Sequence, residues 1–95
     1  MPEPTKEEFE AALAFLRTIP EYQKLVEYGD NPKSNKLLTI RGASVLIGIS
    51  PPFVEQYVTS GRFRGALEYP ELGWRIPYSA LIYFMADLRR QSQTG

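Results

Sequence analysis

The chain has no cysteine and no histidine among its 95 residues. These two absences exclude disulfides, thiolate nucleophiles, imidazole bases and the usual zinc sites. Only carboxylate or lysine chemistry remains open, and the acidic residues are spread along predicted helical surfaces instead of being paired. We therefore expect a protein that is not an enzyme, with no catalytic residue, no metal and no cofactor.

Long apolar runs are also absent, although hydrophobic residues make up 43% of the chain. This composition is typical of a globular protein that neither crosses a membrane nor stays disordered. The start, from Met1 to Glu8, lacks the apolar segment of a secretion signal. We expect one cytoplasmic domain with a modest core and no membrane partner.

The net charge is zero, but the charges are unevenly distributed. Residues 1–32 hold three basic and seven acidic residues, a net charge of −4. Residues 33–77 hold six basic and three acidic residues, a net charge of +3, and the remainder adds +1. The asymmetry indicates an acidic accessory segment beside a mildly basic module. Ordinary solvated faces explain the charge pattern equally well.

Two helices are predicted before a polar loop at residues 28–35. Thr5 to Glu8 form a capping box, and apolar residues at helical spacing predict a helix over about 6–17. A second capping box at Thr18 to Glu21 starts a shorter helix that Gly29 should end. The apolar stripes of this hairpin suit packing on the chain's own core, which we favour, or contact with a partner protein.

After the loop, two short helices joined by a glycine turn are predicted. Thr39 is a good N-cap for a helix over roughly 40–47, and Gly48 supplies the turn between the helices. Ser50 can cap the next helix, which Gly61 should stop. Because a second proline follows Pro51, we expect that helix to start one residue late.

A β-hairpin and a final helix follow in the predicted order. Residues 63–69 suggest one strand, residues 70–73 a turn, and residues 74–76 the return strand. Pro77 marks the entry to a helix over roughly 78–90, and residues 91–95 should form a frayed end. We expect a mainly α fold with a small β-hairpin wing: a winged helix-turn-helix over 37–90, preceded by an acidic helical hairpin and loop over 1–36.

The second half of the chain resembles the excisionase-type, MerR-like family of winged helix-turn-helix proteins. The resemblance covers roughly residues 37–88 and leaves the first 36 unmatched. It is carried by Leu38-Thr39, Ala43, Leu46, Gly48-Ile49-Ser50, Val54, Tyr57-Val58, Ser60-Gly61, Phe63, Trp74-Arg75-Ile76-Pro77, Ala80-Leu81 and Phe84. The order and spacing of these elements are specific together, although none is so alone.

The resemblance implies a DNA-binding protein whose second helix enters the major groove while the wing touches the backbone or minor groove. Members of the family include phage recombination directionality factors, transcription regulators, antitoxin-like repressors and small subunits of phage packaging enzymes. The implied DNA-binding residues are Thr39, Arg41, Pro52, Phe53, Glu55, Gln56, Thr59, Arg62, Arg64 and Arg75. Lys36 is a further candidate for a phosphate contact.

Three departures from the family pattern change how such a helix would read DNA. Gly42 replaces a usual acidic residue of the first helix, and Gly73 replaces a usual basic residue of the wing. Pro51, Pro52 and Phe53 replace polar residues at the front of the second helix, so donor chemistry is lost there. Direct readout then depends on Gln56 pairing with adenine and on apolar contact with a thymine methyl.

Several residues also fit structural roles. Phe53 suits the core as well as it suits DNA, Trp74 is better explained as an anchor of the core or wing, and Glu55 can pair with a nearby arginine. Two functions therefore stay open. The first is a sequence-specific DNA-binding regulator or recombination directionality factor that acts as a dimer or cooperative array. The second is an interaction module that contacts a neighbouring protein through its apolar helix tip or N-terminal helices.

Overall fold

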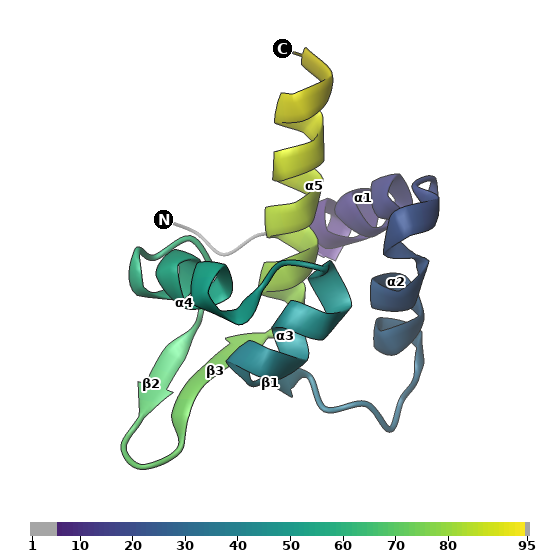
Figure 1. Ribbon diagram of the computed structural model, residues 1–95. Coiled ribbons are helices and arrows are strands. Elements are labelled where there is room, and N and C mark those ends of the chain that lie inside the picture. The colour runs from purple at the N-terminus through teal and green to yellow at the C-terminus, as the bar shows by residue number, and fades with distance from the viewer. Residues whose placement is uncertain (1–5, 95) are drawn as a thin grey trace.

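The computed structural model describes residues 6–94 and is mainly helical, with a small antiparallel sheet (Figure 1). The elements follow in chain order: α1 Lys6–Arg17, a 3-10 turn Pro20–Tyr22, α2 Gln23–Asp30, β1 Leu37–Leu38, α3 Ile40–Ile47, α4 Pro51–Thr59, β2 Leu67–Tyr69, β3 Gly73–Pro77 and α5 Tyr78–Thr94. The predicted bounds of the helices at 6–17 and 40–47 are confirmed. No helix within residues 6–94 is long and apolar enough to span a membrane.

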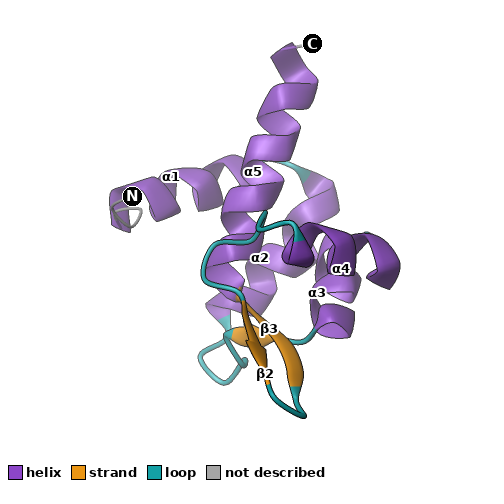
Figure 2. Ribbon diagram, turned by 90° about the vertical axis from the view of Figure 1, so that its left-hand side faces the viewer, coloured by secondary structure: helices purple, strands orange, loops and turns teal. Residues whose placement is uncertain are grey.

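The sheet has three strands in the order β1-β3-β2, and all neighbours are antiparallel. Leu37 lies opposite Pro77 in the pairing of β1 with β3, and Leu67 lies opposite Arg75 in the pairing of β2 with β3. The β2–β3 hairpin extends away from the helices (Figure 2). Its return strand therefore joins the segment before α3 to the segment after α4 in one sheet.

The core lies around the first half of α5, which starts in the middle of the molecule, while its C-terminal end projects beyond the other elements (Figures 1 and 2). Leu81 and Met85 of α5 are fully buried, as helical periodicity predicts for its inner face, and Ile82 next to Leu81 is fully buried as well. Leu16 of α1 and Leu25 of α2 belong to the same buried cluster. The N-terminal helices therefore pack on the chain's own core, which is the alternative we favoured.

The N-terminal hairpin differs from the prediction at two positions. Ile19 occupies the N-cap, and Thr18 does not cap because its hydroxyl donates back to the carbonyl of Phe15 at 2.6 Å. Gly29 lies inside α2, which ends at Asp30 with Asn31 as its C-cap. The predicted cap at Thr5 lies outside the described residues.

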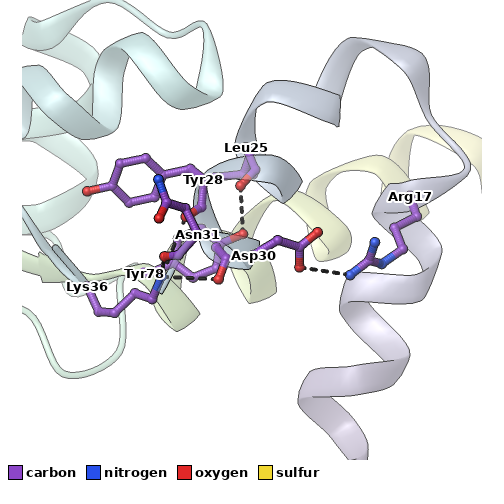
Figure 3. Close-up of polar contacts among 8 residues, drawn as sticks. Arg17, Leu25, Tyr28, Asp30, Asn31, Lys36 and Tyr78 are labelled. Atoms are coloured by element: carbon purple, nitrogen blue, oxygen red, sulfur yellow. Dashed lines mark hydrogen bonds and ion pairs between the residues drawn. The ribbon is translucent and has the colours of Figure 1, made fainter. Parts of the chain in front are cut away.

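Gly29 is explained by a close approach and not by a left-handed turn. A Cβ at position 29 would overlap with the ring of Tyr78, the first residue of α5. The Tyr78 hydroxyl donates to the carbonyl of Leu25 at 2.6 Å, so the ring fastens α2 to the start of α5 (Figure 3). Burial raises the pKa of Tyr78 to about 12, and the charge of Asp30 adds to this effect.

Lys36 closes the same corner from the loop side (Figure 3). Its Nζ donates to the carbonyls of Gly29 and Asn31, both at 3.1 Å, and lies over the rings of Tyr28 and Tyr78. A cation at this position is favourable because the last carbonyls of a helix carry negative partial charge. Lys36 therefore binds the carbonyl end of α2, although its side chain is exposed and stays a candidate for a phosphate contact.

The second half of the chain also differs from the prediction, at two strands and at the end of the last helix. The strand predicted over 63–69 shortens to 67–69, because Phe63 turns into the core and packs edge-on against Phe84, with ring centroids 4.8 Å apart. The strand Leu37–Leu38 was not predicted. The last helix reaches Thr94 instead of ending near Arg90, since no breaker precedes Gly95.

Candidate nucleic-acid interface

Helices α3 and α4 are joined by a short turn whose geometry is fixed by three local features. The Thr39 hydroxyl accepts from the backbone N–H of Gly42 at 3.0 Å and so caps α3. Gly48 ends the helix in the left-handed region at φ 72°, which glycine adopts without steric cost. The Ser44 hydroxyl donates to the carbonyl of Ile49 and holds the turn against α3. This turn fixes the direction in which α4 leaves.

Helix α4 begins at Pro51, one residue earlier than predicted. Ser50 is its N-cap, but only the Ser50 backbone contributes: its carbonyl accepts from the N–H groups of Phe53 and Val54. Both prolines lie in the first turn, where their missing N–H groups would have no helical partner. Burial of Val54 and Val58 outweighs the preference of Pro51 for extended backbone.

Within the described residues, one face of α4 is exposed to solvent. Phe53 is 57% exposed, so its alternative placement in the core is wrong. The Thr59 hydroxyl donates to the carbonyl of Gln56 at 3.1 Å, whereas the Gln56 side chain extends from the exposed face. The predicted residues that the structure brings together on this face are Pro52, Phe53, Glu55, Gln56 and Thr59.

Arg62 and Arg64 follow α4 and line a cleft of about 530 Å³ against α1 and α5. The Arg62 guanidinium lies over the rings of Tyr57 and Phe84, at 5.7 and 5.5 Å from their centroids. Arg90 of α5 lines the same cleft, together with the carboxylates of Glu8 and Asp87. The cleft is therefore a mixed, mildly cationic surface next to the end of α4 and not a purely basic one.

Tyr83 also lines this cleft and supplies a neutral hydroxyl. Burial raises the pKa of Tyr83, and the negative charge of Glu8 acts in the same direction. The phenol therefore stays protonated at neutral pH and can donate a hydrogen bond to an anion.

Arg75 lies on the hairpin and is partly committed to it. Its Nη1 donates to the carbonyls of Leu72 at 3.0 Å and Trp74 at 2.9 Å. Trp74 shares its face of the sheet with Ile76 and packs on the core, so its predicted role as an anchor is confirmed. Arg75 faces the opposite side, as strand alternation predicts, and only the rest of its guanidinium is left to contact a ligand.

Two predicted residues lie at the start of α3. Thr39 is exposed, but its hydroxyl oxygen already accepts the capping bond described above. Arg41 is exposed on α3. Sequence reasoning missed Arg90 because it lies on a helix far along the chain from Arg62, and only the packing of α5 beside α4 brings the two together. Leu67 and Leu72 were also missed as exposed apolar residues of the hairpin.

Comparison with protein-family models, curated proteins and solved structures found no match to this chain.

Proposed function

We propose that α3, α4 and the β2–β3 hairpin form a winged helix-turn-helix that binds double-stranded DNA, as a small regulator or recombination directionality factor. The observation that carries the proposal is the exposed outer face of α4. This helix is anchored on the core by Val54 and Val58, follows a fixed glycine turn, and presents Gln56 to solvent. A short rigid helix of this kind fits the width of the major groove.

Readout along this helix divides into apolar and polar contacts. Phe53 and Pro52 at its front offer apolar surface that matches a thymine methyl. Gln56 follows one turn later and can pair bidentately with an adenine. Glu55 can accept from a cytosine amino group, whereas its negative charge repels nearby phosphates.

Phosphate contacts come from four arginines per chain: Arg41, Arg62, Arg64 and Arg75. Each contact adds nearly one unit to the slope of log affinity against log salt. Four contacts would reduce affinity on the order of 100-fold between 50 and 200 mM salt. One copy would thus bind weakly at physiological salt, and two or more copies on adjacent sites would bind specifically.

Fluorescence anisotropy on the DNA upstream of the protein's own gene, across a salt series, tests the proposal. Arg64→Glu should weaken binding to every sequence and reduce the salt slope, because Arg64 would contact phosphate. The matched control is Lys24→Glu, which makes the same charge change on the exposed side of α2 and should leave binding unchanged. Undetectable or salt-insensitive binding to all such DNA would refute the proposal.

Gln56→Ala separates specific from general binding. It should weaken binding to the preferred site by about 1–3 kcal/mol, which is roughly 5- to 150-fold, and leave binding to unrelated DNA unchanged. An equal loss on both DNAs would assign Gln56 no part in base readout.

A second candidate function is favoured by the exposure of Phe53. With Pro51 and Pro52 beside it, Phe53 gives α4 an apolar tip that suits contact with another protein. In that case, crosslinking to the product of a neighbouring gene should survive Arg64→Glu and be lost in Phe53→Asp. The opposite pattern would exclude this candidate.

A further inference from the structure

The two faces of the small sheet differ sharply in what covers them. Directly paired residues of antiparallel strands place their side chains on the same face. One face carries Leu38, Ile76 and Trp74, which pack into the core. The other, which we call the outer sheet face, consists of Leu37, Leu67, Tyr69, Gly73, Arg75 and Pro77.

The outer sheet face is apolar apart from Arg75. Leu37 is 46% exposed, Leu67 58% and Tyr69 37%. Leu72, at the tip of the hairpin beside this face, is 64% exposed. Together these four side chains expose on the order of 400 Å², a size at which an apolar patch on a protein of this class commonly marks a contact site.

The apolar surface continues past the edge of the sheet. Leu37 and Pro77 also line a groove of about 430 Å³, whose far wall is formed by Phe9 and Leu13 of α1. The surface therefore extends from the hairpin tip across the sheet to the first helix. It is distinct from the cleft of Arg62 and Arg64, which none of these residues lines.

We propose that the outer sheet face binds a second copy of this chain. A stable protein interface buries about 800 Å² on each partner, of which somewhat more than half is apolar, so the patch supplies the apolar part of one such side. The net charge of zero removes the general repulsion between copies. A two-fold contact needs only one patch that matches itself, and this is the commonest symmetry among oligomers.

The two copies meet face to face and not edge to edge. Pairing β2 with β2 of a second copy over its full length Leu67–Tyr69 about a two-fold axis would place Glu68 directly opposite Glu68, and like charges in that position destabilise a sheet. In a contact between two outer sheet faces, Glu68 points away from the second copy, because it lies on the opposite face of the sheet with Trp74. The hydrogen bonds of Arg75 to the carbonyls of Leu72 and Trp74 hold its side chain toward the hairpin tip. Leu37 and Leu67 can therefore contact the same residues of the second copy.

Sedimentation velocity over a concentration series tests this contact without DNA. The wild-type protein should show a monomer–dimer equilibrium. Leu67→Glu should raise the dissociation constant at least about 100-fold, because the contact would bury a carboxylate whose desolvation costs more than its pairing with Arg75 on β3 returns. The matched control is Val45→Glu on α3, since Val45 is 62% exposed and lies off the outer sheet face.

Circular dichroism establishes that each variant is folded, and Leu37→Lys repeats the test from β1 if Leu67→Glu does not fold. A wild-type protein that stays monomeric at a concentration of about 100 μM would overturn the proposal. So would a dimer that neither Leu67→Glu nor Leu37→Lys weakens, or one that Val45→Glu weakens equally. The two proposals can fail separately: a monomer that binds DNA overturns only the dimer, and a dimer that binds no DNA overturns only the DNA-binding proposal.

Discussion

Removing the hydroxyl of Tyr78 should destabilise the protein at neutral pH and protect it at high pH. The side chain is buried, and its hydroxyl donates to the carbonyl of Leu25 at 2.6 Å. Tyr78→Phe removes this bond and leaves the carbonyl with one partner fewer, a loss of about 1–2 kcal/mol. For a domain of this size the loss corresponds to a decrease in melting temperature of roughly 5 to 15 °C.

The pH dependence follows from the titration of the same hydroxyl. Burial raises the pKa of Tyr78 from 10.0 in the unfolded chain to about 12 in the folded protein. A raised folded pKa means that the native state binds the proton more tightly, so the stabilisation is complete below pH 10 and is lost as pH rises through 12. Two pH units correspond to about 3 kcal/mol.

Urea unfolding of both proteins, followed by circular dichroism at pH 7, 10, 11 and 12, measures the difference. The wild type should be more stable by about 1–2 kcal/mol at pH 7. This gap should close and then reverse between pH 10 and 12, because Tyr78→Phe has no proton to lose. Tyr69→Phe, which removes a more exposed hydroxyl, is the control that reports the titration of the remaining groups. A gap that is absent at pH 7, or that stays constant to pH 12, would refute the reasoning.

Three substitutions test other local features by thermal or urea unfolding. Gly29→Ala should destabilise by about 1–3 kcal/mol, because the new Cβ overlaps with the Tyr78 ring, although alanine is otherwise favoured in a helix; an increase in stability would contradict this contact. Thr39→Ala should cost about 1 kcal/mol while Thr39→Ser costs little, since only the capping oxygen matters; equal losses would contradict the cap. Gly48→Ala should cost about 1 kcal/mol from its left-handed backbone alone, because no atom of residues 6–94 lies within 4 Å of the new Cβ, and Gly48→Asn should cost less.

The helices of the second half could be predicted because residues close to their ends determine where they start and stop. Thr39 and Gly48 define α3 by capping and by backbone freedom, both of which act within four residues. Leu81 and Met85 repeat at helical spacing and define the buried side of α5. Signals of this kind do not require knowledge of what the element packs against.

The rest depended on contacts between distant parts of the chain. β1 has two residues and exists only because β3 pairs with it. Gly29 resembled a helix stop, but it has a different role. Because it has no side chain, it leaves room for the ring of Tyr78, 49 positions further along the chain. Phe63 resembled the start of a strand until packing against Phe84 drew it into the core. Tertiary packing overrode local preference at each of these positions.

The candidate interface was predictable in outline and not in its details. The period of α4 placed Gln56 outside once Val54 and Val58 were assigned to the core. Exposure of Phe53 was undecided because it lies next to a buried position, where a small rotation of the helix decides which way a side chain points. The bonds of Arg75 to its own hairpin could not be predicted, since they depend on the turn that brings the Leu72 carbonyl within reach.

The two proposals constrain one another through Arg75. If two copies meet through the outer sheet face, Arg75 lies within that contact and is withheld from DNA, so each copy keeps three candidate phosphate contacts: Arg41, Arg62 and Arg64. A dimer would then show a slope of log affinity against log salt near about −5, whereas four contacts per copy would give about −7. Arg75→Ala should leave the slope of the dimer unchanged if the face is covered, and reduce it by nearly two units if the hairpin contacts DNA. The salt slope therefore decides whether this hairpin acts as a wing on the nucleic acid or as the surface that joins two copies.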